Sequence, residues 1–172
     1  MQGEIGVRSD LGKGALFWFT VPMQIAQTQA PLKTAPNEIT ADEFGQLKIL
    51  VVDDYPINLQ VITAQLQRLG VQVQTAHDGA QALTILMAQD SAFDLVFMDC
   101  EMPIMDGYVA TQNLREWEHQ AERKPIYICG ASAHAMPEYR KRAMVVGMNE
   151  FITKPLRVED LQRVLSLAAG RK

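Results

Sequence analysis

The sequence has few cysteines, no long apolar run and no excess of positive charge. Its two cysteines, Cys100 and Cys129, are too far apart for a CxxC pair, and no leader precedes them, which disfavours disulfides and export. No stretch approaches the roughly 20 apolar residues of a membrane helix. The 16 Lys and Arg against 20 Asp and Glu leave a net charge of -4 and no basic surface for nucleic acid. We expect a cytoplasmic chain with no nucleic acid partner and no direct membrane contact.

Composition divides the chain into three zones. Residues 1–23 contain two strand-like runs, Glu4–Ser9 and Ala15–Val21, joined by a loop whose glycines suit a hairpin. Because two strands alone are only marginally stable in water, this zone is predicted to be the end of a truncated domain. Residues 24–46 are rich in Ala, Gln, Thr and Pro without an apolar period, which predicts a flexible linker.

The third zone, residues 47–170, alternates short apolar runs with helical periods, a pattern typical of repeated βα units. Strands are predicted at Leu47–Val52, Val71–Thr75, Phe93–Asp99, Pro125–Gly130 and Glu150–Ile152. Helices are predicted at Asn58–Leu69, Ala80–Gln89, Tyr108–Glu118, Pro137–Val146 and Val158–Ala169. Since right-handed crossovers put helices on both faces, we predict an α/β, flavodoxin-like, doubly wound five-stranded parallel sheet of order 2-1-3-4-5 with five helices.

Polar residues follow the carboxyl ends of four of these strands. Asp53 and Asp54 follow the first strand, Asp99 ends the third, Ser132 follows the fourth and Lys154 follows the fifth. In a doubly wound sheet ligands bind beyond the carboxyl ends of the strands, so these side chains are expected to meet in one crevice. Any one of them alone would be read as a solvated loop residue. Their joint occurrence favours a binding site.

The expected cluster of Asp53, Asp54 and Asp99 requires positive charge nearby. Two like charges about 4 Å apart repel by on the order of 4 kcal/mol even at an effective dielectric of 20. Oxygen ligands without His or Cys favour a hard cation, and Mg²⁺ fits because it works with few carboxylates and a phosphate. Lys154 supplies a second positive charge suited to phosphoryl oxygens.

Three runs in this zone, Ile49–Asp54, Val96–Gly107 and Gly147–Pro155, resemble the three signature blocks of response-regulator receiver domains. The resemblance covers about Leu47–Ala169 in order and without gaps. It implies a domain that takes a phosphoryl group from the phosphohistidine of a histidine kinase in two-component signalling.

The resemblance implies roles for the acids of the crevice. Asp99 corresponds to the phosphoacceptor, Asp54 to a direct Mg²⁺ ligand and Asp53 to a ligand that acts through water. The backbone carbonyl of Glu101 corresponds to a further metal ligand. The implied cofactor is therefore Mg²⁺.

The resemblance also implies a switch. Ser132 corresponds to the hydroxyl residue that bonds the phosphoryl group, with Lys154 as its cationic partner. Phe151 stands at the aromatic switch position, from which a signal would reach the face formed by the fourth helix, fifth strand and fifth helix. Phe151 could equally be an ordinary core residue. Pro155 is expected in the cis form.

The resemblance also implies which proteins the chain would interact with, and two other functions can be weighed against it. The donor would be a phosphohistidine domain of a histidine kinase, and a histidine phosphotransfer domain is a possible further partner. A receiver that only docks is disfavoured because the acids and the lysine are all present. A stand-alone kinase is disfavoured because neither a complete ATP site nor a phosphorylatable histidine motif is visible. We do not expect the isolated chain to be an enzyme. It would only promote the phosphorylation and dephosphorylation of its own aspartate.

The first zone resembles the last two strands of the ATP-binding domain of sensor histidine kinases. The run Gly3–Pro22 carries this resemblance, with Ala15 where a Ser or Thr normally follows the final glycine loop, which puts a nucleotide contact there in doubt. The implied parent is a hybrid sensor kinase, anchored in the inner membrane, of which this chain would be the C-terminal piece.

Overall fold

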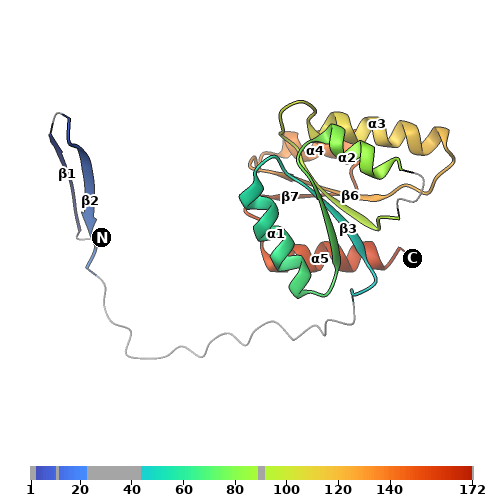
Figure 1. Cartoon of the computed structure of the whole chain (residues 1–172), viewed down its shortest axis with the longest axis horizontal. Helices are drawn as coiled ribbons and strands as arrows, with labels where there is room; N and C mark the ends of the chain where they lie inside the picture. Colours follow the sequence, from blue (N-terminus) through green and yellow to red (C-terminus); the bar gives the residue numbers. More distant parts are fainter. Residues whose placement is uncertain (1–2, 11, 23–43, 89–91, 172) are drawn as a thin grey trace. The chain divides into compact units, whose positions relative to one another are not determined.

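The computed structural model describes residues 3–10, 12–22, 44–88 and 92–171, which are drawn in colour in Figure 1. The chain divides into two compact units, Met1–Glu38 and Ile39–Lys172. Most of the predicted linker and the end of the second predicted helix, at Gln89, lie outside the described residues. Within the described part, no helix is both long enough and apolar enough to cross a membrane.

The larger unit contains a five-stranded parallel sheet flanked by helices on both faces (Figure 1). The strands are β3 (Lys48–Val52), β4 (Gln72–Ala76), β5 (Leu95–Asp99), β6 (Tyr127–Ser132) and β7 (Glu150–Thr153). The helices are α1 (Pro56–Arg68), α2 (Gly79–Leu86), α3 (Gly107–Gln120), α4 (Pro137–Val145) and α5 (Val158–Ala169). The sheet order β4-β3-β5-β6-β7 corresponds to the predicted order 2-1-3-4-5, which is confirmed.

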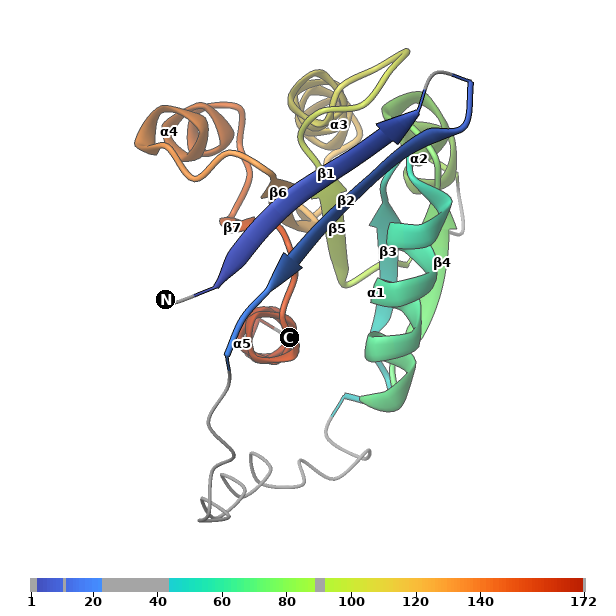
Figure 2. The same cartoon turned by 90° about the vertical axis from the view of Figure 1, so that its left-hand side faces the viewer.

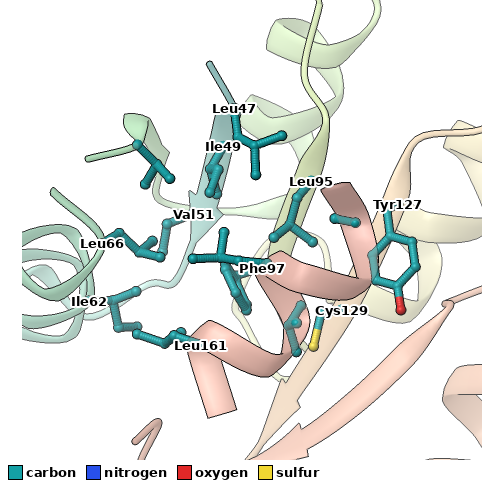
Figure 3. Close-up of a cluster of buried hydrophobic side chains, with 14 of the residues drawn as sticks. Leu47, Ile49, Val51, Ile62, Leu66, Leu95, Phe97, Tyr127, Cys129 and Leu161 are labelled. Atoms are coloured by element: carbon teal, nitrogen blue, oxygen red, sulfur yellow. The ribbon is translucent and has the colours of Figure 1, made fainter. Parts of the chain in front are cut away.

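The sheet lies between α1 and α5 on one face and α2, α3 and α4 on the other (Figure 2). An apolar layer fills the space on each face. Successive residues of a strand point to opposite faces, so Ile49 and Val51 pack against α1 and α5, whereas Leu50 and Val52 pack with α2, α3 and α4. Figure 3 shows the first layer, in which Phe97 of β5 is among the side chains that lie between α1 and α5. Burial of both faces explains why the central strands β3 and β5 are nearly continuous apolar runs, whereas β4, at the edge of the sheet, is partly polar and half exposed.

Local signals place several helix ends as expected. The Asp78 side chain accepts a hydrogen bond of 2.8 Å from the Gln81 N–H and caps α2. Gly70 and Gly147, which follow α1 and α4, have φ angles of 83° and 99°, the left-handed conformation that glycine adopts without strain. Pro137 occupies the first turn of α4.

Most elements start or end a few residues from the predicted boundary, and two of the differences have a clear physical reason. β6 runs from Tyr127 to Ser132 rather than from Pro125 to Gly130, because its pairing with β7 continues through Ser132 and Thr153. Phe44, within the predicted linker, is 3% exposed and belongs to the core, and its carbonyl accepts a hydrogen bond from the Leu47 N–H. The packed unit therefore includes residues before the predicted start at Leu47, because a lone aromatic residue in a polar segment gives no periodic signal.

The smaller unit contains an antiparallel hairpin of β1 (Glu4–Asp10) and β2 (Gly14–Thr20). Cross-strand pairing joins Ile5 to Phe19 and Val7 to Phe17, so these four side chains share one face. Ile5, Phe17 and Phe19 are 85%, 78% and 75% exposed. Within this unit, the described residues offer no cover for that apolar face.

Candidate functional site

Buried acids lie where β3 and β5 end. Asp53 is 1% exposed and Asp99 is 5% exposed, whereas Asp54 is half-buried. One carboxylate oxygen from each of the three lies within 4.8 Å of the others. The convergence predicted from the parallel sheet is therefore present, because neighbouring parallel strands deliver their carboxyl ends to the same edge.

Lys154 reaches the same cluster from the loop after β7. Its Nζ lies 2.6 Å from Asp53 Oδ2 and 2.6 Å from Asp99 Oδ2. Its backbone N–H donates to the Ser132 carbonyl at 2.8 Å, which ties the loop to the end of β6, and the following peptide bond to Pro155 is cis, as expected. One ammonium thus contacts two buried carboxylates.

The charges of the cluster do not balance. When all groups are ionised, Asp53, Asp54, Asp99 and Lys154 carry a net charge of -2. Burial raises the pKa of Asp99, and the hydrogen bond and charge of Lys154 oppose that rise only in part. Burial disfavours the ammonium of Lys154, but its hydrogen bonds to Asp53 and Asp99 outweigh burial and raise its pKa. The cluster is therefore electrostatically suited to a divalent cation.

The donor set also suits a hard cation. Every candidate ligand atom of Asp53, Asp54 and Asp99 is an oxygen, with no His or Cys in the group. The Glu101 N–H donates to Asp99 Oδ1 at 3.2 Å, which holds the segment after β5 close to the cluster. That the Glu101 carbonyl binds metal stays a prediction.

Ser132 and Phe151 lie in the two strands beside the acids. Ser132 is 1% exposed at the end of β6, and its Oγ accepts a hydrogen bond of 3.0 Å from the His134 N–H. Phe151 of β7 is 5% exposed and packs in the layer shared with α3 and α4. This arrangement fits a core residue and is also compatible with a switch, so both interpretations of Phe151 stay open.

Two contacts at the site were not foreseen from the sequence. Asn58, in the first turn of α1, donates from Nδ2 to Asp53 Oδ1 at 2.9 Å and to Oδ2 at 3.2 Å. His134 Nδ1 lies 3.2 Å from Glu101 Oε1, and its ring stacks on Tyr139 at 4.5 Å. A polar residue one turn into the helix that follows a pair of acids was the signal available for Asn58. No sequence signal marked the His134 contact.

The chain matches one protein family and is similar in sequence to several known proteins. The family model described as "Response regulator receiver domain" matches residues 49–166. Hybrid signal transduction histidine kinase K of Dictyostelium discoideum is 35% identical over 100% of this chain, and Sensor protein EvgS of Escherichia coli K12 is 38% identical over 96%. The chain spans only 14% and 13% of the length of these two relatives.

Solved structures of similar fold include receiver domains with bound metal. The receiver domain of sensor histidine kinase PA1611 from Pseudomonas aeruginosa, solved with a magnesium ion in its active site cleft, is 35% identical. The match has a TM-score of 0.63 and covers 72% of this chain and 98% of that one. The receiver domain of the histidine kinase CKI1 from Arabidopsis thaliana, complexed with Mg²⁺ and BeF₃⁻, is 29% identical with a TM-score of 0.64, covering 73% and 94%.

Proposed function

This chain belongs to the response regulator receiver domain family, and from that membership and the acidic cluster we propose that Asp99 accepts a phosphoryl group from a phosphohistidine in a Mg²⁺-dependent reaction. The chain is thus a receiver of two-component phosphorelay signalling. The observation that carries the assignment of Asp99 is its contact with Lys154 inside a group of three converging carboxylates.

The proposed metal ligands are Asp54 and Asp99 directly, Asp53 through water, and the backbone carbonyl of Glu101. Three oxygen donors within 4.8 Å and a net charge of -2 support this set. Bound Mg²⁺ would supply positive charge beside the oxygens of the transferring phosphoryl group.

In the proposed transfer, a carboxylate oxygen of Asp99 forms a bond to phosphorus while the bond from phosphorus to the donor histidine nitrogen breaks. Lys154 neutralises charge that gathers on the equatorial oxygens, and it contacts Asp99 already. Catalysis is then mainly positioning and electrostatic stabilisation.

The proposed switch begins with the new phosphoryl group. The phosphoryl oxygens can accept hydrogen bonds. Ser132 and Lys154 would move toward them and donate those bonds. The Ser132 hydroxyl would then leave its present contact with the His134 N–H, and Phe151 would follow into the vacated space. The readout would be a change in the face formed by α4, β7 and α5.

We propose a cytoplasmic location and two kinds of partner. The donor would be the phosphohistidine domain of a histidine kinase, and a histidine phosphotransfer domain would be a further acceptor. Two relatives that match nearly the whole chain, a hybrid histidine kinase and a sensor protein, support a histidine kinase as the source of the phosphoryl group. The parent would be a hybrid kinase, in which membrane anchoring would come from other segments.

The hairpin in residues 1–23 is proposed to be the end of a histidine kinase ATP-binding domain, with residues 24–46 as the linker and 47–170 as the receiver. The exposed face formed by Ile5, Val7, Phe17 and Phe19 supports this, because a lone hairpin has no partner layer. The extent of the kinase relatives' match, which includes the hairpin, supports it as well.

A phosphorylation assay tests the proposed function. The full chain is incubated with Mg²⁺ and acetyl phosphate and resolved on a phosphate-affinity gel, with EDTA as the control. We expect a retarded band with Mg²⁺ and none with EDTA or in Asp99→Asn. ATP alone should leave the chain unlabelled. A wild-type chain that never shifts would favour the alternative of a receiver that acts only by docking.

A further inference from the structure

We propose that Asn58 is a positioning residue that holds Asp53 in the orientation needed for Mg²⁺ binding. This inference rests on the proposed function of the site. The geometry points to it because Asn58 contacts both oxygens of a carboxylate that is 1% exposed, at 2.9 and 3.2 Å. A buried carboxylate needs such donors, since an unsatisfied one is costly.

The oxygens of Asp53 receive three donor groups. Oδ1 accepts from the Tyr55 N–H at 2.9 Å and from Asn58, and Oδ2 accepts from Lys154 at 2.6 Å and from Asn58. Asn58 is the group among them that reaches both oxygens, so together with Tyr55 and Lys154 it restrains the rotation of the carboxylate about its own axis. Asp53 is then oriented to approach a cation through water.

The position of Asn58 in α1 explains how it can act. The helix begins at Pro56, and the residue before it, Tyr55, caps it without a side-chain hydrogen bond. The Asn58 side chain is directed across to the end of β3, where it links the first turn of α1 to Asp53. The contact thus restrains the helix and the carboxylate together.

The residue type matters because of the charge of the cluster. The three carboxylates and Lys154 leave a net charge of -2, which one divalent cation neutralises. A cationic donor at position 58 would remove part of that charge, and an acidic residue would repel Asp53. An amide donates hydrogen bonds without altering the balance, so Asn58 orients Asp53 and leaves the attraction for the metal intact.

The test compares two substitutions in the full chain. Asn58→Ala removes the donor and the volume, whereas Asn58→Leu removes the donor and keeps a side chain of similar size. Gln60→Ala, an exposed amide in the same helix, is the matched control. The dissociation constant for Mg²⁺ is measured by isothermal titration calorimetry, and the initial rate with acetyl phosphate is measured as a function of Mg²⁺ concentration.

We expect both Asn58 variants to bind Mg²⁺ about 10-fold more weakly, the lower end of the range seen when partners of metal ligands are removed. Saturating Mg²⁺ should restore their rate close to that of wild type, and Gln60→Ala should behave as wild type. A purely structural role predicts a loss of rate that no Mg²⁺ concentration restores, or a normal Asn58→Leu variant.

Either of those outcomes, or unchanged Mg²⁺ affinity in both variants, would overturn the role of Asn58. Failure of the proposed function is a different result, because in that case the wild-type chain itself would neither bind Mg²⁺ nor become phosphorylated.

Discussion

The two ends of the parallel sheet both contain charged residues, but they use them differently. At the carboxyl ends, three carboxylates converge and one ammonium, Lys154, contacts two of them, Asp53 and Asp99, so two negative charges remain uncompensated. Near the starts of β6 and β7, a buried ion pair joins two residues of α3, Arg115 and Glu118, and the charges of this pair balance.

The Arg115 cluster is saturated by its neighbours. Nη1 lies 2.6 Å from Glu118 Oε2, Nε donates to the Gly147 carbonyl at 2.9 Å, and Nη2 donates to the Ile126 carbonyl and Asn149 Oδ1. Glu118, which is 2% exposed, also accepts from the Ile126 N–H at 2.8 Å. These bonds hold α3 to the starts of β6 and β7.

Burial of charge is therefore not by itself a sign of function. The amino-end cluster has one partner for each charge and serves to hold elements together. The carboxyl-end cluster has more negative than positive charge, and that excess attracts a divalent cation, which together with Lys154 would offset the negative charge of a phosphoryl group.

Among these substitutions, removal of the Lys154 ammonium should have the largest effect on the carboxyl-end cluster. We expect Lys154→Met to lower the rate of phosphorylation by acetyl phosphate on the order of 100-fold, because one donor to the developing charge is lost. The same substitution should tighten Mg²⁺ binding, because Asp53 and Asp99 lose their competing cation. Calorimetry and the phosphate-affinity gel measure the two effects.

The exposed Lys141 on α4 provides the control for this experiment. Lys141→Met should leave both quantities unchanged. A Lys154→Met chain that is phosphorylated at the wild-type rate would contradict the proposed role of Lys154.

Removing Arg115 should have a large effect on stability and little on the site. Arg115→Met leaves the buried Glu118 carboxylate without its cation, and the free energy of unfolding should fall by about 3 kcal/mol. Urea denaturation measures this change, and calorimetry should give an unchanged dissociation constant for Mg²⁺ in the folded protein.

The double variant Arg115→Met/Glu118→Met sharpens the test. Because no buried charge is then left unpaired, it should be more stable than Arg115→Met alone. If both variants lost Mg²⁺ binding while remaining folded, the two ends of the sheet would not be independent.

The smallest effect is expected at Glu150 of β7, which bridges Arg140 and Arg163 at 2.9 Å each. Burial alone would raise the pKa of Glu150, but hydrogen bonds from the Phe151 N–H and Arg163, with the charge of Arg140, lower it. A lowered pKa stabilises the fold above the ordinary value of about 4.3, and that stability is lost as the pH falls below it.

Glu150→Gln should therefore cost about 1 kcal/mol at pH 7, since both arginines are about half exposed. The difference from wild type should shrink as the pH falls below the ordinary glutamate pKa of about 4.3 and through the lower pKa of the folded wild-type carboxylate. Urea denaturation over this pH range gives the comparison, and a difference that stayed constant with pH would rule out the ionised carboxylate as its source.

Much of the fold and site could be predicted because the relevant signals are local. Strands buried on both faces must be apolar throughout, so Leu50, Val96 and their neighbours appear as short runs. The acids that end those runs identify the crevice, and Asp78, Gly70 and Gly147 mark helix ends. The end of β6 was misplaced because Ser132 is held by pairing with Thr153, a partner distant in sequence.

The sequence by itself determined the alternation of strands and helices and the order in which Asp53, Asp99 and Lys154 follow the strands, because side-chain period and residue type are properties of short segments. The donors to those groups depend on tertiary structure, since Asn58 approaches Asp53 across a turn and Lys154 approaches Asp99 from the loop after β7. Hydrogen bonds between segments depend on directions that the packing of α1 and β7 against the sheet sets. The residue types and spacings within short segments do not specify the directions of these hydrogen bonds.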